Sequence, residues 1–241
     1  MKRNIGIIPA RGGSKRIPRK NVKPFLGKPI LCYSIETLLQ TGLFEEVMVS
    51  TDDEEIAETA RAYGAKVPFL RSRETANDFA TITDVIQEVL ARYEERGRDF
   101  DNVCCMLPTS PLTQWEDVKE AYALFEKQDA PAICPVVPFS YPIWRSLKVD
   151  GDGKMSMFWP ENMNARSQDL EPAYHDSGSF YWGKKTAILQ YHTFFVPGCM
   201  AWVMDEMRVQ DIDNEVDWQL AEMKYRLLGN LCCKESGVLG Q

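Results

Sequence analysis

Short apolar runs alternate with amphipathic segments over the first 135 residues of the chain. Continuous apolar runs predict buried strands at Ile5–Ile8, Val47–Ser50, Val103–Leu107 and Ile133–Val137. A further run, Ala65–Leu70, predicts a short strand that Pro68 weakens. Because these runs lack polar alternation, they are typical of a parallel sheet covered by helices on both faces. The pattern therefore predicts an α/β fold with a mostly parallel sheet.

Helical periodicity occupies the intervals between these runs. Apolar side chains recur with the period of a helix over Pro29–Gln40 and, most clearly, over Ile82–Tyr93. Thr51–Glu54 and Thr113–Glu116 have the form of capping boxes, which predicts that two further helices begin there. The later part of the chain predicts strands at Gly178–Trp182 and Ala201–Met204 and a last helix at Asn214–Leu228.

The loops that follow the predicted strands are the places to look for a binding site. Ligands of parallel sheets bind beyond the carboxyl ends of the strands, where the connecting loops meet at one edge. In this chain those loops are residues 9–24, 50–53, 70–80 and 106–113. Binding residues are therefore expected in these four loops.

The alternation of strands and helices stops between residues 138 and 180, where proline, aromatic and turn residues dominate. Asp150–Gly153 predicts a hairpin turn. Large apolar side chains such as Tyr141, Trp144 and Phe158 have no regular element to bury them, so they either fold back on the sheet or pack on a second subunit. We expect the second arrangement, a dimerisation arm in a homodimer. The expected organisation is a core of 1–137 and 178–230, an insertion at 138–177 and a tail at 231–241.

Basic residues are concentrated at the start of the chain. The 241 residues include 28 Lys and Arg against 35 Asp and Glu, a net charge of −7. Residues 1–35 carry nine of the basic side chains and no acidic one, so the rest of the chain has a net charge of −16. This distribution argues against nucleic acid as a partner and favours the binding of one small polyanion.

The composition also bears on location and on metal content. No apolar run approaches the roughly 20 residues of a membrane span, and the run after Asn4 is too short for a secretory signal. We therefore expect a cytoplasmic protein that does not contact a membrane. Seven cysteines without a C-x-x-C pair indicate reduced thiols. With His175 and His192 as its only histidines, the chain is a poor candidate for a clustered zinc site.

The loop after the first predicted strand carries the clearest candidate chemistry. Its glycines allow backbone N–H groups to approach an anion, and its basic and hydroxyl side chains are what a bound polyphosphate requires. The candidate residues are Arg11, Gly12, Gly13, Ser14, Lys15 and Lys20. Neither the Walker pattern nor G-x-G-x-x-G is present. The loop therefore predicts another kind of nucleotide site, with a solvated basic loop as the alternative.

The segment IPARGGSKRIPRKN, residues 8–21, closely resembles the signature loop of the CMP-sugar synthetases, cytidylyltransferases that act on sialic acid and related nine-carbon 2-keto acids. The resemblance covers nearly the whole chain and includes Val49–Asp53, Arg71 with Glu74–Asp78, Leu107–Pro111, Arg166–Asp169 and Asp211–Asp213. It implies a Rossmann-like nucleotidyltransferase fold and transfer of CMP from CTP to the anomeric hydroxyl of the sugar, with release of pyrophosphate. Such products are precursors of surface glycans or of flagellin glycosylation.

The resemblance also implies roles for particular residues. The in-line attack at the α-phosphorus requires positioning and charge neutralisation, for which Arg11, Lys15 and Lys20 are the candidate catalytic groups. Together with Ser14 they would hold the triphosphate, and Asn21 would orient the loop or contact the nucleotide. The residues implied in recognition of cytosine and ribose are Arg71, Asn77, Asp78 and Thr81.

Two carboxylates, Asp211 and Asp213, alternate just before the last predicted helix. Such a pair suits Mg²⁺, which binds through one or two carboxylates plus substrate phosphates. The alternative is an acidic cluster that caps the helix, with Asp213 at its start. The resemblance favours the metal and implies Mg²⁺ as the cofactor.

The expected sugar contacts are Met106, Arg166 and Gln168. Where sialic acid synthetases typically carry a glutamine, this chain has Met106, which suits a sugar that presents a methyl group. Arg166 and Gln168 are candidates for the sugar carboxylate and acyl groups, reached across a dimer. The pattern over 138–143, 158–162 and 167–176 looks most like the pseudaminic acid branch of the family, whose sugar ends in a methyl group.

Other functions remain open at this point. One is the same reaction on legionaminate or N-acetylneuraminate, and another is a non-catalytic nucleotide-binding module of the same fold. An oligonucleotide-binding protein is disfavoured, because residues 9–24 contain no aromatic side chain to stack on a base.

Overall fold

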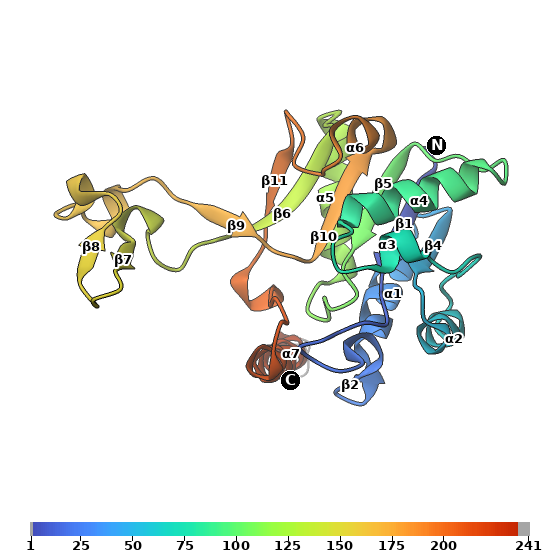
Figure 1. Ribbon diagram of the computed structural model, residues 1–241, viewed down its shortest axis with the longest axis horizontal. Coiled ribbons are helices and arrows are strands. Elements are labelled where there is room, and N and C mark those ends of the chain that lie inside the picture. The colour runs from blue at the N-terminus through green and yellow to red at the C-terminus, as the bar shows by residue number, and fades with distance from the viewer. Residues whose placement is uncertain (1, 236–241) are drawn as a thin grey trace, which may run out of the picture.

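A central sheet with helices on both faces forms the body of the protein, and a long arm extends from one side of it (Figure 1). The computed structural model describes residues 2–235. The sheet has seven strands in the order β11-β6-β10-β5-β1-β4, with β9 paired to β6. The strands are β1 (Asn4–Pro9), β4 (Glu46–Ser50), β5 (Asn102–Met106), β6 (Ala132–Pro138), β9 (Tyr174–Asp176), β10 (Phe180–Lys184) and β11 (Met200–Val203).

The expectation of a mostly parallel α/β sheet is confirmed. β1 runs parallel to both β4 and β5, and β11 runs parallel to β6. The strands that run the other way are β10, which lies antiparallel between β5 and β6, and β9. All four apolar runs expected to form strands in the first 138 residues are strands of this sheet.

Two hydrophobic clusters lie on opposite faces of the sheet. In β1, Ile8 belongs to one cluster, whereas Ile5 and Ile7 belong to the other, as the two-residue period of a strand requires. The Ile8 cluster includes residues of α1 (Ile30–Thr41), α2 (Glu54–Ala62) and α5 (Trp115–Lys127). The Ile7 cluster includes residues of α4 (Ile82–Glu94) and α6 (Lys185–Tyr191). Both faces are therefore covered.

Shorter elements complete the chain. A third cluster joins α7 (Glu215–Glu235) to the hairpin of β2 (Pro24–Phe25) and β3 (Lys28–Pro29), with Phe25 and Trp218 in edge-to-face contact. A four-residue helix, α3 (Arg73–Ala76), precedes α4. Single turns of 3-10 helix lie at Lys20–Val22, Ile143–Arg145, Pro160–Asn162, Ser167–Asp169 and Glu206–Arg208.

Both helices with an expected capping box are present, but their caps are different residues. The N-cap of α2 is Asp53, whose Oδ1 accepts the N–H of Ile56 at 3.1 Å. The N-cap of α5 is Gln114, whose N–H donates to Asp117 Oδ2 at 3.0 Å. The predictions that the boxes begin at Thr51 and Thr113 are therefore wrong, because a carboxylate or amide side chain closer to each helix satisfies its free N–H groups.

Two other elements differ from the prediction. The run Ala65–Leu70 is an extended segment that makes one parallel bridge, between Lys66 and Met48, rather than a strand. Pro68 has no N–H to continue a ladder beyond that bridge. The last helix extends to Glu235, seven residues past the expected end, so it enters the expected tail.

The insertion at 138–177 forms the arm seen to the left in Figure 1. The hairpin expected at Asp150–Gly153 is confirmed: it joins β7 (Leu147–Val149) to β8 (Met155–Met157). Asp150 Oδ1 accepts the N–H groups of Asp152 and Lys154, and Gly153 has a φ of 79°, which closes the turn. The arm exposes several large apolar side chains, of which Tyr141 is 84% exposed. Its role in dimerisation remains a prediction.

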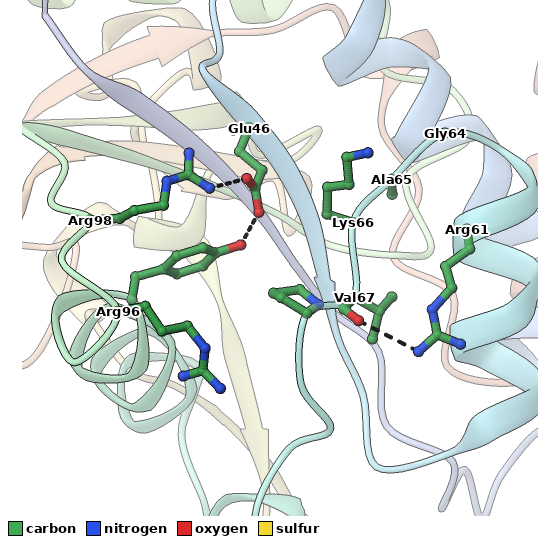
Figure 2. Close-up of a pocket in the computed structure, with 10 residues that line it drawn as sticks. Glu46, Arg61, Gly64, Ala65, Lys66, Val67, Arg96 and Arg98 are labelled. Atoms are coloured by element: carbon green, nitrogen blue, oxygen red, sulfur yellow. Dashed lines mark hydrogen bonds and ion pairs between the residues drawn. The ribbon is translucent and has the colours of Figure 1, made fainter.

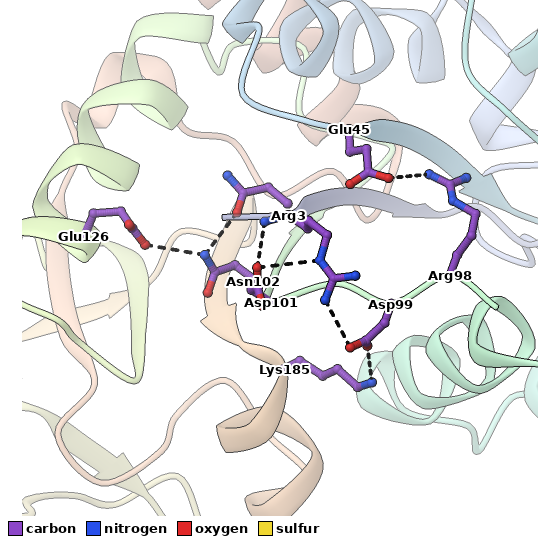
Figure 3. A network of polar contacts seen from close by, with 9 residues as sticks. Arg3, Glu45, Arg98, Asp99, Asp101, Asn102, Glu126 and Lys185 are labelled. Atoms are coloured by element: carbon purple, nitrogen blue, oxygen red, sulfur yellow. Dashed lines mark hydrogen bonds and ion pairs between the residues drawn. The ribbon is translucent and has the colours of Figure 1, made fainter. Parts of the chain in front are cut away.

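The amino-terminal edge of the sheet is closed by paired charges (Figure 3). Arg3 donates its N–H to Asp101 at 2.8 Å and forms an ion pair with Asp99, which also binds Lys185 at 2.6 Å. Asn102 donates to Asn4 Oδ1 at 3.0 Å. These charges already have partners, so the candidate chemistry lies at the opposite edge.

Candidate active site

The loop after β1 lies at the edge of the sheet where β1, β4 and β5 end, with Pro9 in register with Ser50. Two cavities lie along this edge, with volumes of about 370 and about 230 Å³. The larger, called the loop cavity here, is lined by Pro9, Arg11, Ser14, Lys15, Arg16, Lys20, Asn21, Leu107, Pro108 and Thr109. The smaller, called the side cavity, is lined by Pro9, Arg11, Arg71, Thr75, Asn77, Asp78, Ala80, Thr81, Ile82, Val85 and Leu107.

The two cavities separate the expected nucleotide residues into two groups. The residues expected to bind the triphosphate line the loop cavity: Arg11, Ser14, Lys15 and Lys20. The residues expected to recognise cytosine and ribose line the side cavity: Arg71, Asn77, Asp78 and Thr81. Arg11 lines both, so the cavities adjoin. This arrangement can hold a nucleoside in one cavity and its phosphates in the other.

The Asp78 carboxylate spans the basic side chains of the loop. Its Oδ1 accepts from Arg11 at 2.6 Å, and its Oδ2 accepts from Lys15 at 2.5 Å. These hydrogen bonds, with Lys15 first and Arg11 second, hold the pKa of Asp78 below its usual range. A carboxylate of this chain therefore occupies the donors that are expected to hold a triphosphate.

The two glycines of the loop have different surroundings. A Cβ at Gly12 would lie 2.8 Å from Asp53 Oδ2, and the Gly12 N–H donates to Asp52 Oδ1 at 3.0 Å. Gly12 therefore allows close packing on the 52–53 segment, and the anion that its N–H binds is Asp52. That differs from the expected role at a ligand. A Cβ at Gly13 would meet nothing within 4 Å, so Gly13 adjoins open space.

Several of the expected nucleotide residues use their side chains to hold the loops. Asn21 is buried and donates from Nδ2 to the Arg11 carbonyl at 2.9 Å, which orients the loop. Asn77 accepts the N–H groups of Phe79 and Ala80. Thr81 is the N-cap of α4 and forms a capping box with Asp84. These contacts fix the shape of the side cavity.

Arg71 is also buried, at 8% exposure, and its guanidinium donates to Ser50 Oγ at 3.1 Å. Burial lowers its pKa, and the Asp52 and Glu88 carboxylates oppose that shift. Arg71 is therefore held rigidly at the end of β4, on the wall of the side cavity.

Asp211 and Asp213 lie beside the loop, although they are almost 200 residues away in sequence. Arg16 pairs with Asp213 Oδ1 at 2.6 Å, and Lys20 Nζ donates to the Ile212 carbonyl at 2.7 Å. Burial lowers the pKa of Lys20, and Asp213 and Asp211 oppose this effect. Burial, and then the charge of Asp213, raise the pKa of Asp211. The carboxylate pair therefore favours an additional cation.

The alternative role of Asp213 as a helix cap is filled by its neighbour. Asn214 Oδ1 accepts the N–H groups of Val216 and Asp217, at 2.8 and 3.1 Å. Asp217 Oδ2 accepts the N–H groups of Asp213 and Asn214, at 2.9 and 3.0 Å. The Asp213 carboxylate is thus left to face the loop. Over the described residues, no three His, Cys, Asp or Glu side chains form a metal-binding group, so a Mg²⁺ ion here would need substrate oxygens as further ligands.

The three expected sugar contacts are not brought together. Met106 has 0% exposure and packs in the core, so its expected contact with the sugar is wrong for this structure. Arg166 lies in the arm, where it pairs with Asp169 at 2.7 Å. Gln168 lines a cavity within the arm itself. Because the arm extends away from the body (Figure 1), these two residues do not reach the loop cavity of their own chain.

Arg16 and Asp217 are functional candidates that the sequence pattern did not single out. Arg16 holds Asp213, and Asp217 fixes the backbone of that residue. The position of Arg16 within the basic loop was the available signal for the first. A carboxylate four residues after Asp213, at a helix start, was the signal for the second.

No helix in the described part of the chain is long and apolar enough to cross a membrane.

Comparison with known proteins agrees with this geometry. A family model described as cytidylyltransferase matches residues 5–196. The chain is 41% identical over 225 residues to a pseudaminic acid cytidylyltransferase of Campylobacter jejuni, a match that covers 93% of this chain and 97% of the relative. It is 33% identical to a CMP-N,N'-diacetyllegionaminic acid synthase of Legionella pneumophila, again over 93% and 97% of the two chains.

The fold has solved counterparts. A CMP:2-keto-3-deoxy-manno-octonic acid synthetase complexed with CTP is similar with a TM-score of 0.68 and 18% identity, over 95% of this chain and 99% of the other. A 4-diphosphocytidyl-2C-methyl-D-erythritol synthase of Anaerococcus prevotii is similar with a TM-score of 0.62 and 13% identity, over 93% and 99%. A nucleotidyltransferase fold, a basic loop at the carboxyl edge of its sheet and a family match over most of the length together place this chain in the cytidylyltransferase family.

Proposed function

We propose that this protein transfers CMP from CTP to the anomeric hydroxyl of pseudaminic acid and releases pyrophosphate. The observation that carries the proposal is the 41% identity to a pseudaminic acid cytidylyltransferase over 93% of the chain. The two adjoining cavities, one basic and one lined by the 71–82 segment, support it because they suit a nucleoside triphosphate. CTP is a cytoplasmic metabolite, so we propose the cytoplasm as the site of the reaction.

The basic side chains of the loop would hold the triphosphate. Arg11 and Lys15 exchange the Asp78 carboxylate for phosphate oxygens, and Ser14 adds a hydroxyl donor. Lys20, fixed by the Ile212 carbonyl, stabilises the charge that develops on the departing pyrophosphate. In this proposal Arg11, Lys15 and Lys20 are the catalytic residues, and Arg71 lines the nucleoside side.

The carboxylates of Asp211 and Asp213 are the proposed ligands of Mg²⁺. Their fit rests on the raised pKa of Asp211 and on the proximity of Lys20 and Arg16, which together indicate a place where an acidic pair attracts cations. Mg²⁺ bound there would supply charge neutralisation at the phosphates. Asp217 would keep Asp213 in position through its backbone N–H.

The sugar contacts are proposed to come from a second subunit. Arg166 binds the Asp169 carboxylate with Nε and Nη2, at 2.7 and 3.2 Å, which is the geometry that a sugar carboxylate would meet. The exposed apolar side chains of the arm support a homodimer, because the isolated chain leaves them in water. Gln168 would accompany Arg166 into the partner's site.

A parallel assay of three sugars tests the substrate. Pyrophosphate release from CTP is measured with pseudaminate, legionaminate and N-acetylneuraminate, each over a range of concentrations. We expect the highest kcat/KM with pseudaminate. Equal values for all three would refute a pseudaminate-specific site, and a preference for legionaminate would assign the chain to that branch of the family. No pyrophosphate release with any of them would support a non-catalytic nucleotide-binding protein.

A further inference from the structure

The largest cavity of those described here lies away from the proposed active site and has no role in the reaction. Its volume is about 490 Å³, within the range of small-molecule sites. Its polar side chains are Glu46, Arg61, Lys66, Tyr93, Arg96 and Arg98. They come from the start of β4, from α2, from the segment after α2, and from the end of α4 and the turn after it (Figure 2). We call this the basic cavity.

The one carboxylate that lines the basic cavity is already neutralised. Glu46 is 12% exposed and accepts from both Arg98 and the buried Tyr93 hydroxyl. The hydrogen bond from Arg98 to Glu46 raises the pKa of Arg98, which therefore stays charged. Glu46 and Arg98 thus form a neutral, hydrogen-bonded side of the cavity.

The remaining basic side chains leave a positive excess. Within the described part of the chain, neither Lys66 nor Arg96 forms an ion pair. Arg96 donates to the Arg92 carbonyl at 2.7 Å and lies over the Phe69 ring, so its charge is placed but not neutralised. Arg61 pairs with Glu54, which lies outside the cavity. A protein with a net charge of −7 therefore gathers unneutralised cations around one cavity.

The walls of the cavity combine these charges with apolar surface. Val67 and Pro68 form part of the lining, and both belong to the extended segment along β4. That segment is held by hydrogen bonds from Lys66 N to the Val47 carbonyl at 2.8 Å and from Val49 N to the Lys66 carbonyl at 2.9 Å. The backbone that presents Lys66 is therefore fixed before any ligand arrives.

We propose that the basic cavity binds a small phosphate-bearing anion, held by Lys66, Arg96 and Arg61. Convergent cations in a concave site suit phosphate oxygens, because each phosphate accepts several hydrogen bonds and carries more than one charge. The apolar wall accommodates an organic group attached to the phosphate. Inorganic pyrophosphate and a nucleoside monophosphate share this chemistry, and the experiment separates them.

The test is isothermal titration of the full chain with inorganic pyrophosphate and, separately, with CMP. For at least one of them we expect two classes of sites per chain in the unsubstituted protein. The double variant Lys66→Glu/Arg96→Glu loses one class, and Arg11→Ala/Lys15→Ala loses the other. If only pyrophosphate shows the second class, the ligand is the phosphoanion itself. If CMP shows it too, the apolar wall contributes.

Controls separate this site from a general effect of charge. Lys127→Glu/Lys154→Glu makes the same change in net charge at exposed positions outside the cavity, and it should keep both classes of sites. The positions changed in the basic cavity are exposed, so all variants should retain the melting temperature of the unsubstituted protein. Two unchanged classes of sites in Lys66→Glu/Arg96→Glu would overturn the proposal. So would a single class in the unsubstituted protein that only Arg11→Ala/Lys15→Ala abolishes. Neither result depends on the identity of the sugar substrate.

Discussion

Asp78 Oδ1 lies 2.6 Å from a guanidinium nitrogen of Arg11, the residue that lines both cavities of the proposed active site. The other carboxylate oxygen of Asp78 holds Lys15. An internal anion therefore competes with the triphosphate for the same donors. CTP has to displace this carboxylate, so the segment that carries Asp78 is expected to shift when the nucleotide binds.

Asp78→Asn is therefore expected to strengthen CTP binding. The amide keeps the size of the side chain but removes the competing charge, and we expect a dissociation constant about two- to fivefold lower, as for loss of an exposed ion pair. Titration calorimetry with CTP in the absence of the sugar measures it. Asp99→Asn, which breaks ion pairs at the opposite edge of the sheet, is the matched control and should leave binding unchanged. Weaker CTP binding in Asp78→Asn would show that Asp78 contacts the nucleotide directly.

Lys20→Ala is expected to slow turnover much more than it weakens cytidine binding. Lys20 lies on the phosphate side of the site, where its charge acts on the departing pyrophosphate. Loss of one such stabilising group lowers kcat by about 100-fold, while the dissociation constant of CMP changes little. Lys23→Ala is the control on the same loop, because Lys23 pairs with Glu215 and does not line either cavity. An unchanged kcat in Lys20→Ala would remove Lys20 from the catalytic group.

Most of the fold could be predicted from the sequence because the signal is local. Runs such as Ile5–Ile8 are apolar on both faces, which only a sheet covered on both sides satisfies. The same rule also holds for Met106. Side chains alternate along β5, so that Cys104 and Met106 share one hydrophobic cluster and Cys105 belongs to the other. Comparison with the sugar-binding position of relatives outweighed this pattern and led to the wrong assignment of Met106.

The parts that could not be predicted depend on distant residues. The pairs Arg16–Asp213 and Lys23–Glu215 join positions almost 200 residues apart, and no period in the sequence specifies them. The direction in which the arm leaves the body has the same origin, because few contacts tie it to the sheet beyond β9. The basic loop itself was predictable, since its charges and glycines are consecutive in the sequence.

Gly12→Ala and Gly13→Ala should have opposite outcomes. A Cβ at position 12 would lie 2.8 Å from Asp53 Oδ2 and 3.0 Å from Asp53 Cβ, so the loop has to move away from α2. Overpacking of this kind costs about 1–3 kcal/mol, a melting temperature lower by about 3–9 °C, and it should also reduce kcat/KM because Arg11 is displaced. At position 13 a Cβ meets nothing within 4 Å, so stability should be retained. Thermal melts of both variants decide the point, and equal melting temperatures would contradict the close packing at Gly12.

Asp213→Ala is expected to abolish the response of turnover to Mg²⁺ while CTP binding persists. The variant removes one of the two proposed metal ligands and also frees Arg16, so the loop gains positive charge that retains the triphosphate. Initial rates over a Mg²⁺ series and CTP titrations without metal measure the two effects. Glu222→Ala, which breaks an ion pair with Arg226 on the last helix, is the control. A full Mg²⁺ response in Asp213→Ala would refute the metal assignment.

Mixed dimers should show whether Arg166 acts on the partner's site. In a dimer of one Lys20→Ala subunit and one Arg166→Ala subunit, one site keeps both an intact loop and an intact arm if the arm crosses to the partner. Such a mixed dimer, purified with two different affinity tags, should recover about half the turnover of the unsubstituted dimer, whereas each parent variant stays inactive. The control joins Lys20→Ala to Lys15→Ala. Both changes lie on the loop, so every site of that mixed dimer is defective and no recovery is expected. Inactivity of both mixed dimers would mean that the arm serves its own chain, against the direction in which it extends.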